Sequence, residues 1–247
     1  MIRAMIEFAN PEKFERIAGP LTNGLALVAA LALGLGLWLA FWGSPSDYQQ
    51  GDSVRIMYVH VPAASFALGA YVAMAAASFT GFVFKHPLAD VAAKSIAPVG
   101  AALTLLALIT GSIWGKPMWG AWWAWDARLT SMLVLLFLYI GYMALWRAID
   151  DPLRAARVAA IVAMAGAVNV PIVKFSVDWW NSLHQPASIF RAGGPSIDGS
   201  MLAPLGVMAL FYATWAGSVV LTLMRAELAE RRAARLEAVA RPASRLS

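Results

Sequence analysis

Six long apolar stretches dominate the sequence, at residues 21–42, 61–84, 91–114, 129–147, 156–177 and 202–224. Each meets the length of about 20 residues that a helix needs to cross the hydrocarbon core of a bilayer. The backbone finds no water there and must satisfy its own hydrogen bonds, which favours helices. Because 60% of the residues are hydrophobic and only 13% are charged, a soluble globular domain is excluded. We therefore predict an all-α, polytopic membrane protein with six transmembrane helices.

The basic residues predict how the chain is oriented, because cytoplasmic loops carry an excess of Lys and Arg. The N-terminal segment, the second and fourth loops and the C-terminal tail hold fourteen of the nineteen basic residues. The other three loops hold only four, which are Arg55, Lys116, Arg128 and Arg191. Both termini are therefore predicted to be cytoplasmic, and these three loops share the outer face, periplasmic in a Gram-negative host. The net charge of +5 reflects this asymmetry and does not indicate a nucleic-acid partner.

Three parts are expected along the chain: a cytoplasmic interfacial segment (1–20), a six-helix membrane domain (21–224) and a cytoplasmic tail (225–247). Asn10, Pro11 and Glu12 have the order of an N-cap, a first-turn proline and a first-turn acid. Glu227 and Arg231 have i,i+4 spacing, so the sixth helix is expected to continue into the tail as a solvated extension.

Small residues recur at four-residue steps in the second stretch, at Ser65, Gly69, Ala73, Ala77 and Gly81. Such a stripe allows another helix to approach closely. Both an internal helix and a helix of a partner protein stay open as its occupant.

Tryptophan is concentrated in the loop over residues 114–128. Five of the chain's eleven tryptophans lie there: Trp114, Trp119, Trp122, Trp123 and Trp125. An interfacial aromatic belt puts only one or two such residues at a helix end, and so does not account for five. Tryptophan offers a large, stiff, apolar plane with one N–H donor, which suits a flat hydrophobic ligand.

Spacing predicts the conformation of this loop. Gly115, Pro117 and Gly120 predict an irregular first half. The second half, if helical, would align Trp119, Trp122, Trp123 and Asp126 along one aromatic face, because they follow i, i+3, i+4, i+7 spacing. Asp126 is also a candidate N-cap for the fourth helix.

Two of the three histidines are predicted on the same outer face as the tryptophan loop. His60 comes directly before a helix that takes Pro62 in its first turn, and the positive end of that helix helps to keep the ring neutral. His184 lies at the outer end of the fifth helix. Two imidazoles with a flat hydrophobic ring between them describe bis-histidine haem, with His60 and His184 as axial ligands to the iron. A structural histidine is the alternative for each, while zinc would need further ligands where acids are few.

The absence of cysteine excludes covalent attachment of haem through thioethers in this chain, so any haem would be bound non-covalently or held by a partner. The expected cofactor is haem b, bound non-covalently. Haem propionates call for cations, and Arg55 and Arg128 are the leading candidates. Each is equally interpretable as an ordinary surface charge. The segment from Gly111 to Lys116 is one residue short of a phosphate-binding loop, so no ATPase motif is present.

The pattern Trp-Gly-x-x-x-Trp-Gly-x-Trp-Trp-x-Trp-Asp from Trp114 to Asp126, with one histidine before it and one after, closely resembles the WWD motif of haem-handling proteins. The segments Val59-His-Val-Pro62 and Leu183-His-Gln-Pro186, the length and the six spans make the chain similar to the cytochrome c maturation protein C, or haem exporter protein C, family.

This resemblance implies a haem-handling scaffold of cytochrome c biogenesis in the bacterial inner membrane, and not an enzyme. Its axial ligands at the periplasmic surface would be His60 and His184, and its tryptophan motif would present the haem edge to the haem chaperone, cytochrome c maturation protein E (CcmE). The family works with an ATP-binding cassette pair, CcmA and CcmB, and with a small one-span protein, CcmD. Two alternatives stay open: a bis-histidine membrane electron carrier and a haem permease.

Overall fold

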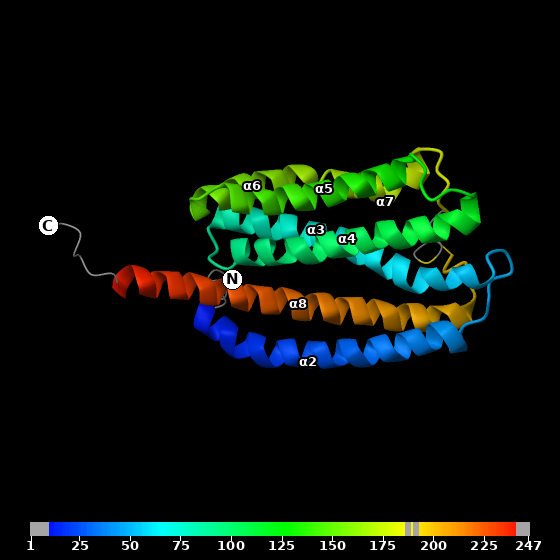
Figure 1. The fold of residues 1–247 in the computed structure, drawn as a ribbon, viewed down its shortest axis with the longest axis horizontal. Helices are drawn as coiled ribbons and strands as arrows, with labels where there is room; N and C mark the ends of the chain where they lie inside the picture. Colours follow the sequence, from blue (N-terminus) through cyan, green and yellow to red (C-terminus); the bar gives the residue numbers. More distant parts are fainter. Residues whose placement is uncertain (1–9, 186–188, 190–192, 241–247) are drawn as a thin grey trace.

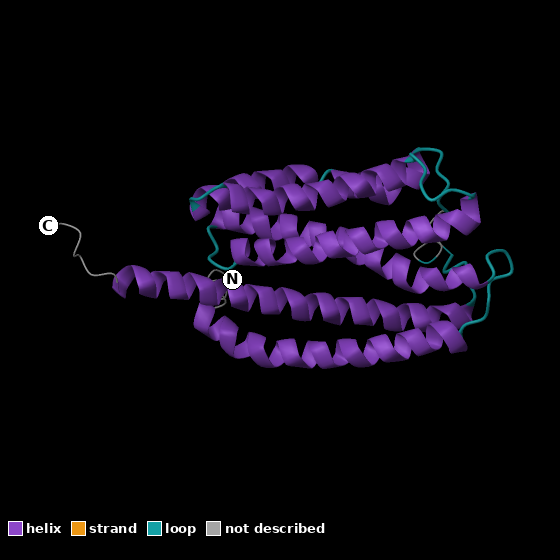
Figure 2. Cartoon of the chain, in the orientation of Figure 1, coloured by secondary structure: helices purple, strands orange, loops and turns teal. Residues whose placement is uncertain are grey.

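The computed structural model describes residues 10–185, 189 and 193–240, which form an elongated bundle of helices (Figure 1). Six segments are long and apolar enough to cross a membrane: Pro11–Gly43, Asp52–Phe84, Ala89–Trp119, Ala127–Ala148, Pro152–Trp179 and Gly199–Ala240. Helices and their connections account for the described chain, and it contains no β-strand (Figure 2). The prediction of an all-α fold with six apolar helices is confirmed.

The helices are α2 (Pro11–Trp38), α3 (Met57–Phe84), α4 (Ala89–Trp119), α5 (Ala127–Ala148), α6 (Pro152–Gly166), α7 (Asn169–Trp179) and α8 (Gly199–Ala240). A π-helical turn, η1 (Leu39–Gly43), follows α2, and a 3₁₀ turn, η2 (Asp52–Ile56), leads into α3. Helices α2 and α8 pack along each other on one side of the bundle, α3 and α4 form its middle, and α5, α6 and α7 cover the opposite side (Figure 1).

The predicted start of the first helix is confirmed. Pro11 occupies the first helical position, and the Asn10 side chain accepts a hydrogen bond from the Glu12 N–H at 2.9 Å. Helix α2 then runs without a break from this cap into the first apolar stretch. The interfacial location of residues 1–20 stays a prediction.

The fifth span is interrupted between α6 and α7. Pro171 has no N–H to donate to the carbonyl four residues earlier, which weakens the helix at this point. The polar side chain exposed by the break finds a partner, because Asn169 Nδ2 donates to the Ser131 carbonyl of α5 at 2.9 Å. The interruption therefore leaves the span anchored to its neighbour.

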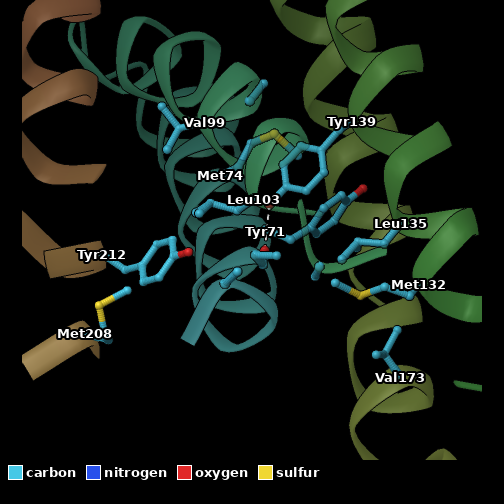
Figure 3. Close-up of a cluster of buried hydrophobic side chains, with 14 of the residues drawn as sticks. Tyr71, Met74, Val99, Leu103, Met132, Leu135, Tyr139, Val173, Met208 and Tyr212 are labelled. Carbon is cyan, nitrogen blue, oxygen red and sulfur yellow. Dashed lines mark hydrogen bonds between the residues drawn. The ribbon is translucent and has the colours of Figure 1, made fainter. Parts of the chain in front are cut away.

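Tyrosines fill the middle of the bundle (Figure 3). Tyr71 of α3 and Tyr139 of α5 are fully buried, with ring centres 5.0 Å apart, and the Tyr139 hydroxyl donates to the Ala67 carbonyl at 2.8 Å. A Cβ at Gly100 would clash with the Tyr139 hydroxyl, and one at Gly166 would clash with that of Tyr71. These two glycines therefore make the room that the tyrosines occupy.

The extension of α8 beyond the bundle is joined to α4 at its base (Figure 1). Arg231 Nε donates to Glu227 at 2.8 Å, which confirms the predicted i,i+4 pair. Arg231 also bonds Asp90 of α4 at 3.0 Å, and Lys94 bonds Glu227 at 2.6 Å. The expectation of a solvated extension is therefore wrong for the base of the extension, where opposite charges of α4 and α8 meet. Residues 232–240 beyond it are exposed.

The small-residue stripe of α3 is divided along its length. A Cβ at Gly81 would lie 3.5 Å from Ala89 of α4, so this end packs within the chain. A Cβ at Gly69 would meet no described atom within 4 Å, and Ser65 and Ala73 are exposed. Internal packing accordingly accounts for only part of the stripe.

The connections fall into two groups at opposite ends of the bundle (Figure 1). The segments after α2, α4 and α7 lie at one end, whereas the α3–α4 and α5–α6 connections lie at the other, near the first turn of α2. Every described candidate residue of the site therefore belongs to the first end.

Candidate functional site

His60 lies inside the first turn of α3 and not in the loop before it, so the predicted location is wrong by a few residues. The 3₁₀ turn η2 feeds directly into α3 at Met57, and this moves the helix start upstream of the histidine. The His60 ring faces α4, where its centre lies 5.7 Å from that of Trp114 in an edge-to-face contact. Its Nδ1 lies 3.1 Å from the hydroxyl of Thr110.

That hydroxyl decides which nitrogen of His60 carries the proton. Thr110 Oγ1 donates its own hydrogen to the Leu106 carbonyl at 2.7 Å, and can therefore only accept from the histidine. Nδ1 is then the protonated nitrogen of a neutral ring. Nε2 is left with a lone pair that can bind a metal.

Gly111 lets the His60 ring approach α4. A Cβ at this position would lie 3.0 Å from Cε1 of the histidine, closer than nearly all side-chain contacts. Gly111 is adjacent to Thr110 and one turn before Trp114 on the same helix. These residues of α4 together form the surface against which His60 rests.

The tryptophan segment has the reverse of its predicted conformation. Helix α4 continues through Gly115 and Pro117 to Trp119, and residues 120–126 are not helical. Gly120 ends the helix in the left-handed conformation, with φ of 76°, and its N–H bonds the Lys116 carbonyl at 3.1 Å. A glycine in this position is a strong terminator, because it adopts a left-handed φ without strain. The predicted single face of Trp119, Trp122, Trp123 and Asp126 is therefore wrong.

Tryptophans of the non-helical half reach the surface. Trp122 and Trp125 are 59% and 77% exposed. The ring centre of Trp123 lies 5.4 Å from that of Trp125, and its Nε1–H is buried without an acceptor in the described part of the chain. The segment thus offers an open apolar surface and a buried, unused donor.

His184 follows α7 and contacts Trp119 and Asp126 of the tryptophan segment. Its ring centre lies 4.9 Å from that of Trp119, again edge to face. Its Nδ1 lies 3.0 Å from Oδ2 of Asp126, which also accepts from the Ser182 hydroxyl at 2.6 Å. The other oxygen, Oδ1, accepts from the Leu129 N–H at 2.8 Å, so Asp126 is the predicted N-cap of α5.

The pair of Asp126 and His184 is a carboxylate facing a neutral ring. Burial pushes the pKa of Asp126 up, but the hydrogen bonds from Ser182, the Leu129 N–H and His184 outweigh it and hold the pKa below its usual value. Burial also lowers the pKa of His184, and this outweighs the opposite effect of Asp126. At neutral pH the Nδ1–H of His184 therefore donates to an ionised acceptor, and its Nε2 is left with a lone pair.

Two neutral imidazoles thus contact the last turns of one helix, His60 at Trp114 and His184 at Trp119. The described residues contain no cluster of three or more His, Cys, Asp or Glu side chains able to hold a metal ion. The donor set suits a metal that brings its own equatorial ligands, as haem iron does.

The predicted propionate-binding cations have structural partners. Arg55 donates to the carbonyls of Ala40 and Phe41, the latter at 2.9 Å, and so caps the end of the first span. Arg128 joins α5 to α7 through the Ser176 hydroxyl at 3.3 Å and the Lys174 carbonyl at 3.2 Å. Lys116 donates to the carbonyl of Gly120 at 3.0 Å, and Arg191 lies outside the described residues. A role of these cations towards propionates stays a prediction.

Comparison with known proteins identifies the family. The family model described as Heme exporter protein C matches residues 4–239. Proteins named Heme exporter protein C are similar: that of Bradyrhizobium diazoefficiens is 51% identical over 94% of this chain and 88% of its own length. Those of Escherichia coli K12 and Paracoccus denitrificans are 46% and 42% identical, over 91% and 93% of this chain and 90% and 95% of their own lengths. The chain belongs to the heme exporter protein C family.

Four residues at the site of this family member were missed from the sequence. Thr110 and Gly111 support His60, and their positions one turn before Trp114 on an apolar helix were the available signal. Gln50 accepts from the Trp114 indole N–H at 2.9 Å and ties the first loop to α4, but nothing in its sequence context indicates this. The Ser182 hydroxyl accepts a hydrogen bond from the His184 N–H at 3.1 Å. This is a local serine turn, which a serine two residues before His184 can form.

Proposed function

We propose that this chain holds haem b non-covalently at the end of the bundle that carries the tryptophan segment, and delivers it for cytochrome c biogenesis. Membership of the heme exporter protein C family supports a role in haem delivery. In the proposed site, His60 and His184 supply the two axial nitrogens. Both rings have Nδ1 within hydrogen-bonding distance of a protein acceptor, which leaves Nε2 as the nitrogen with the lone pair, and this shared arrangement is the observation that carries the proposal.

The surroundings of the two histidines suit a flat hydrophobic ligand. Trp114 and Trp119 contact the rings at their edges, so apolar surface adjoins both nitrogen donors. Trp122 and Trp125 stay exposed, which favours a ligand held at the surface over one buried in the bundle. The exposed edge is then available to a partner.

The partner that takes the haem is proposed to be the periplasmic chaperone CcmE, in a complex that contains CcmA, CcmB and CcmD. The site would accordingly face the periplasm, as the distribution of Lys and Arg predicts. In this role the chain binds and orients haem, and the chemistry of covalent capture belongs to the chaperone.

A permease that moves haem through the bundle is less well supported. Tyr71, Met74 and Tyr139 are fully buried and occupy the centre of the helix packing (Figure 3). Passage of a haem-sized molecule would need these side chains and the glycines that seat them to move apart. Presentation at one surface needs no such opening.

Single replacements of the histidines test the site. The protein is purified with its partner proteins and bound haem, and visible spectra are recorded for wild type, His60→Ala, His184→Ala and His86→Ala. His86 lies at the opposite end of the bundle, where its ring accepts from the Leu88 N–H, so its replacement is a matched control. We expect the low-spin spectrum in wild type and His86→Ala only. Low-spin haem in both of the other variants would show that the site is wrongly assigned.

Haem transfer separates a delivery scaffold from an electron carrier. The loaded protein is mixed with purified, haem-free chaperone, and the two are then separated by affinity capture. A delivery protein loses its haem to the chaperone, whereas an electron carrier retains it through repeated oxidation and reduction. Retention of all haem would contradict the proposed function.

A further inference from the structure

We infer that Asp126 is a positioning residue for His184, which it orients and polarises so that His184 is the stronger of the two axial ligands. This inference rests on the proposed function. Asp126 is the last residue of the tryptophan motif. In this role it acts on His184 and does not itself contact haem.

Both oxygens of Asp126 are fixed. Oδ1 accepts from the Leu129 N–H at 2.8 Å, which ties the carboxylate to the first turn of α5. Oδ2 accepts from Ser182 at 2.6 Å and from His184 Nδ1 at 3.0 Å. The two side chains of the pair are only 8% and 17% exposed, Asp126 being the more buried. A carboxylate held by three donors leaves His184 little freedom to rotate.

The hydrogen bond has a chemical consequence for His184. An ionised carboxylate only accepts, so the shared proton stays on Nδ1 and the lone pair on Nε2. A carboxylate behind a metal-binding histidine also raises the basicity of the ligating nitrogen. Asp126 therefore keeps Nε2 unprotonated and makes it a better electron donor.

His60 has a weaker partner. Its Nδ1 bonds a neutral hydroxyl, that of Thr110, at 3.1 Å. Hydrogen bonds to an ionised partner are roughly twice as strong as neutral ones, so the polarisation of His60 is smaller. The two imidazoles would consequently donate unequally to a bound iron, and His184 would be the stronger donor.

The replacement Asp126→Asn tests this role while keeping the helix cap. Asparagine caps helices as well as aspartate does, so its Oδ1 still accepts from the Leu129 N–H. The amide nitrogen then takes the place of Oδ2 and donates to Nδ1, which moves the histidine proton to Nε2. We expect haem affinity to fall about 10- to 100-fold. We also expect the midpoint potential of the remaining bound haem to rise, because a less basic ligand stabilises ferric iron less.

Two further variants serve as controls. His86→Ala, at the opposite end of the bundle, should leave the midpoint potential unchanged. Thr110→Val removes the neutral acceptor behind His60 and should shift the potential less than Asp126→Asn does. An unchanged potential and affinity in Asp126→Asn would overturn the inference, as would an equal shift in Thr110→Val.

A second measurement leaves Asp126 in place, so its result does not depend on whether the Asp126→Asn variant folds. In His184→Gly, added imidazole fills the vacated ligand position and presents an N–H to Asp126, whereas 1-methylimidazole has no such hydrogen. A hydrogen bond to a charged group strengthens binding by about tenfold or more. Imidazole should therefore restore the low-spin spectrum at about one tenth of the concentration that 1-methylimidazole needs. Equal concentrations would contradict the role of Asp126. A low-spin spectrum in His184→Gly without any added base would instead contradict the proposed function itself.

Discussion

Gly111 is the residue on which the close approach of His60 to α4 depends. A Cβ there would lie 3.0 Å from the His60 ring and push it away from Thr110. We therefore predict that Gly111→Ala reduces haem retention by about tenfold, because a displacement of this kind strains an axial bond and weakens the hydrogen bond behind it. Retention is measured as the rate of haem loss to excess apomyoglobin.

The matched control is Gly141→Ala on α5. A Cβ at Gly141 would meet no described atom within 4 Å, so the substitution changes only helix propensity. Its rate of haem loss should equal that of wild type. If Gly111→Ala also loses haem at the wild-type rate, the His60 ring does not rest where the structure has it.

His184 gives the haem-free protein a pH dependence. Burial lowers the pKa of His184 from 6.5, so the folded state resists protonation while the unfolded chain takes up a proton near pH 6.5. The unfolded state then binds more protons, and stability falls as the pH decreases below that value. We predict that the Tm of haem-free wild type falls from pH 7 to pH 5 by more than that of His184→Gln. Parallel curves for the two proteins would exclude this contribution.

At the scale of elements, length and apolarity were sufficient to predict the six spans, because both are local properties of the sequence. The ends of the helices at the site were not predicted. Helix α4 passes through Gly115 and Pro117, since one missing N–H is tolerated in a helix held by its neighbours, and ends only where Gly120 turns left-handed. Helix α3 begins before His60 because η2 continues into it. Such boundaries depend on tertiary contacts, which periodicity does not reveal.

The base of the α8 extension is predicted to depend on its charge network with α4. Arg231→Gln removes the bonds to Asp90 and Glu227, whose side chains are 27% and 13% exposed. Partly exposed pairs contribute about 1 kcal/mol or less, so we expect a small decrease in Tm at low salt that becomes smaller at high salt. Arg235→Gln, on the exposed part of the same extension, should change Tm at neither salt concentration. An equal loss in both variants would mean that the contacts with α4 contribute nothing.

At the scale of the whole molecule, the site is assembled from segments far apart in the chain. His60 meets Thr110 across fifty residues, and Asp126 meets His184 across fifty-eight. The charge distribution predicted that both histidines share one face, but not which side chains stand behind them. That information requires the packing of α3 on α4 and of α7 on α5. The buried ring pair of Tyr71 and Tyr139 joins α3 to α5 in the same core.

Orientation of the whole bundle in the membrane is the last prediction. Tyr48 near the site is 91% exposed and Val239 on the α8 extension is 85% exposed, so cysteines there are open to reagents in water. The chain has no cysteine of its own and therefore gives no background. With the basic residues cytoplasmic, Tyr48→Cys should react with an impermeant maleimide in intact spheroplasts, and Val239→Cys only after permeabilisation. The reverse pattern would put the two histidines on the cytoplasmic side and rule out direct delivery to a periplasmic chaperone.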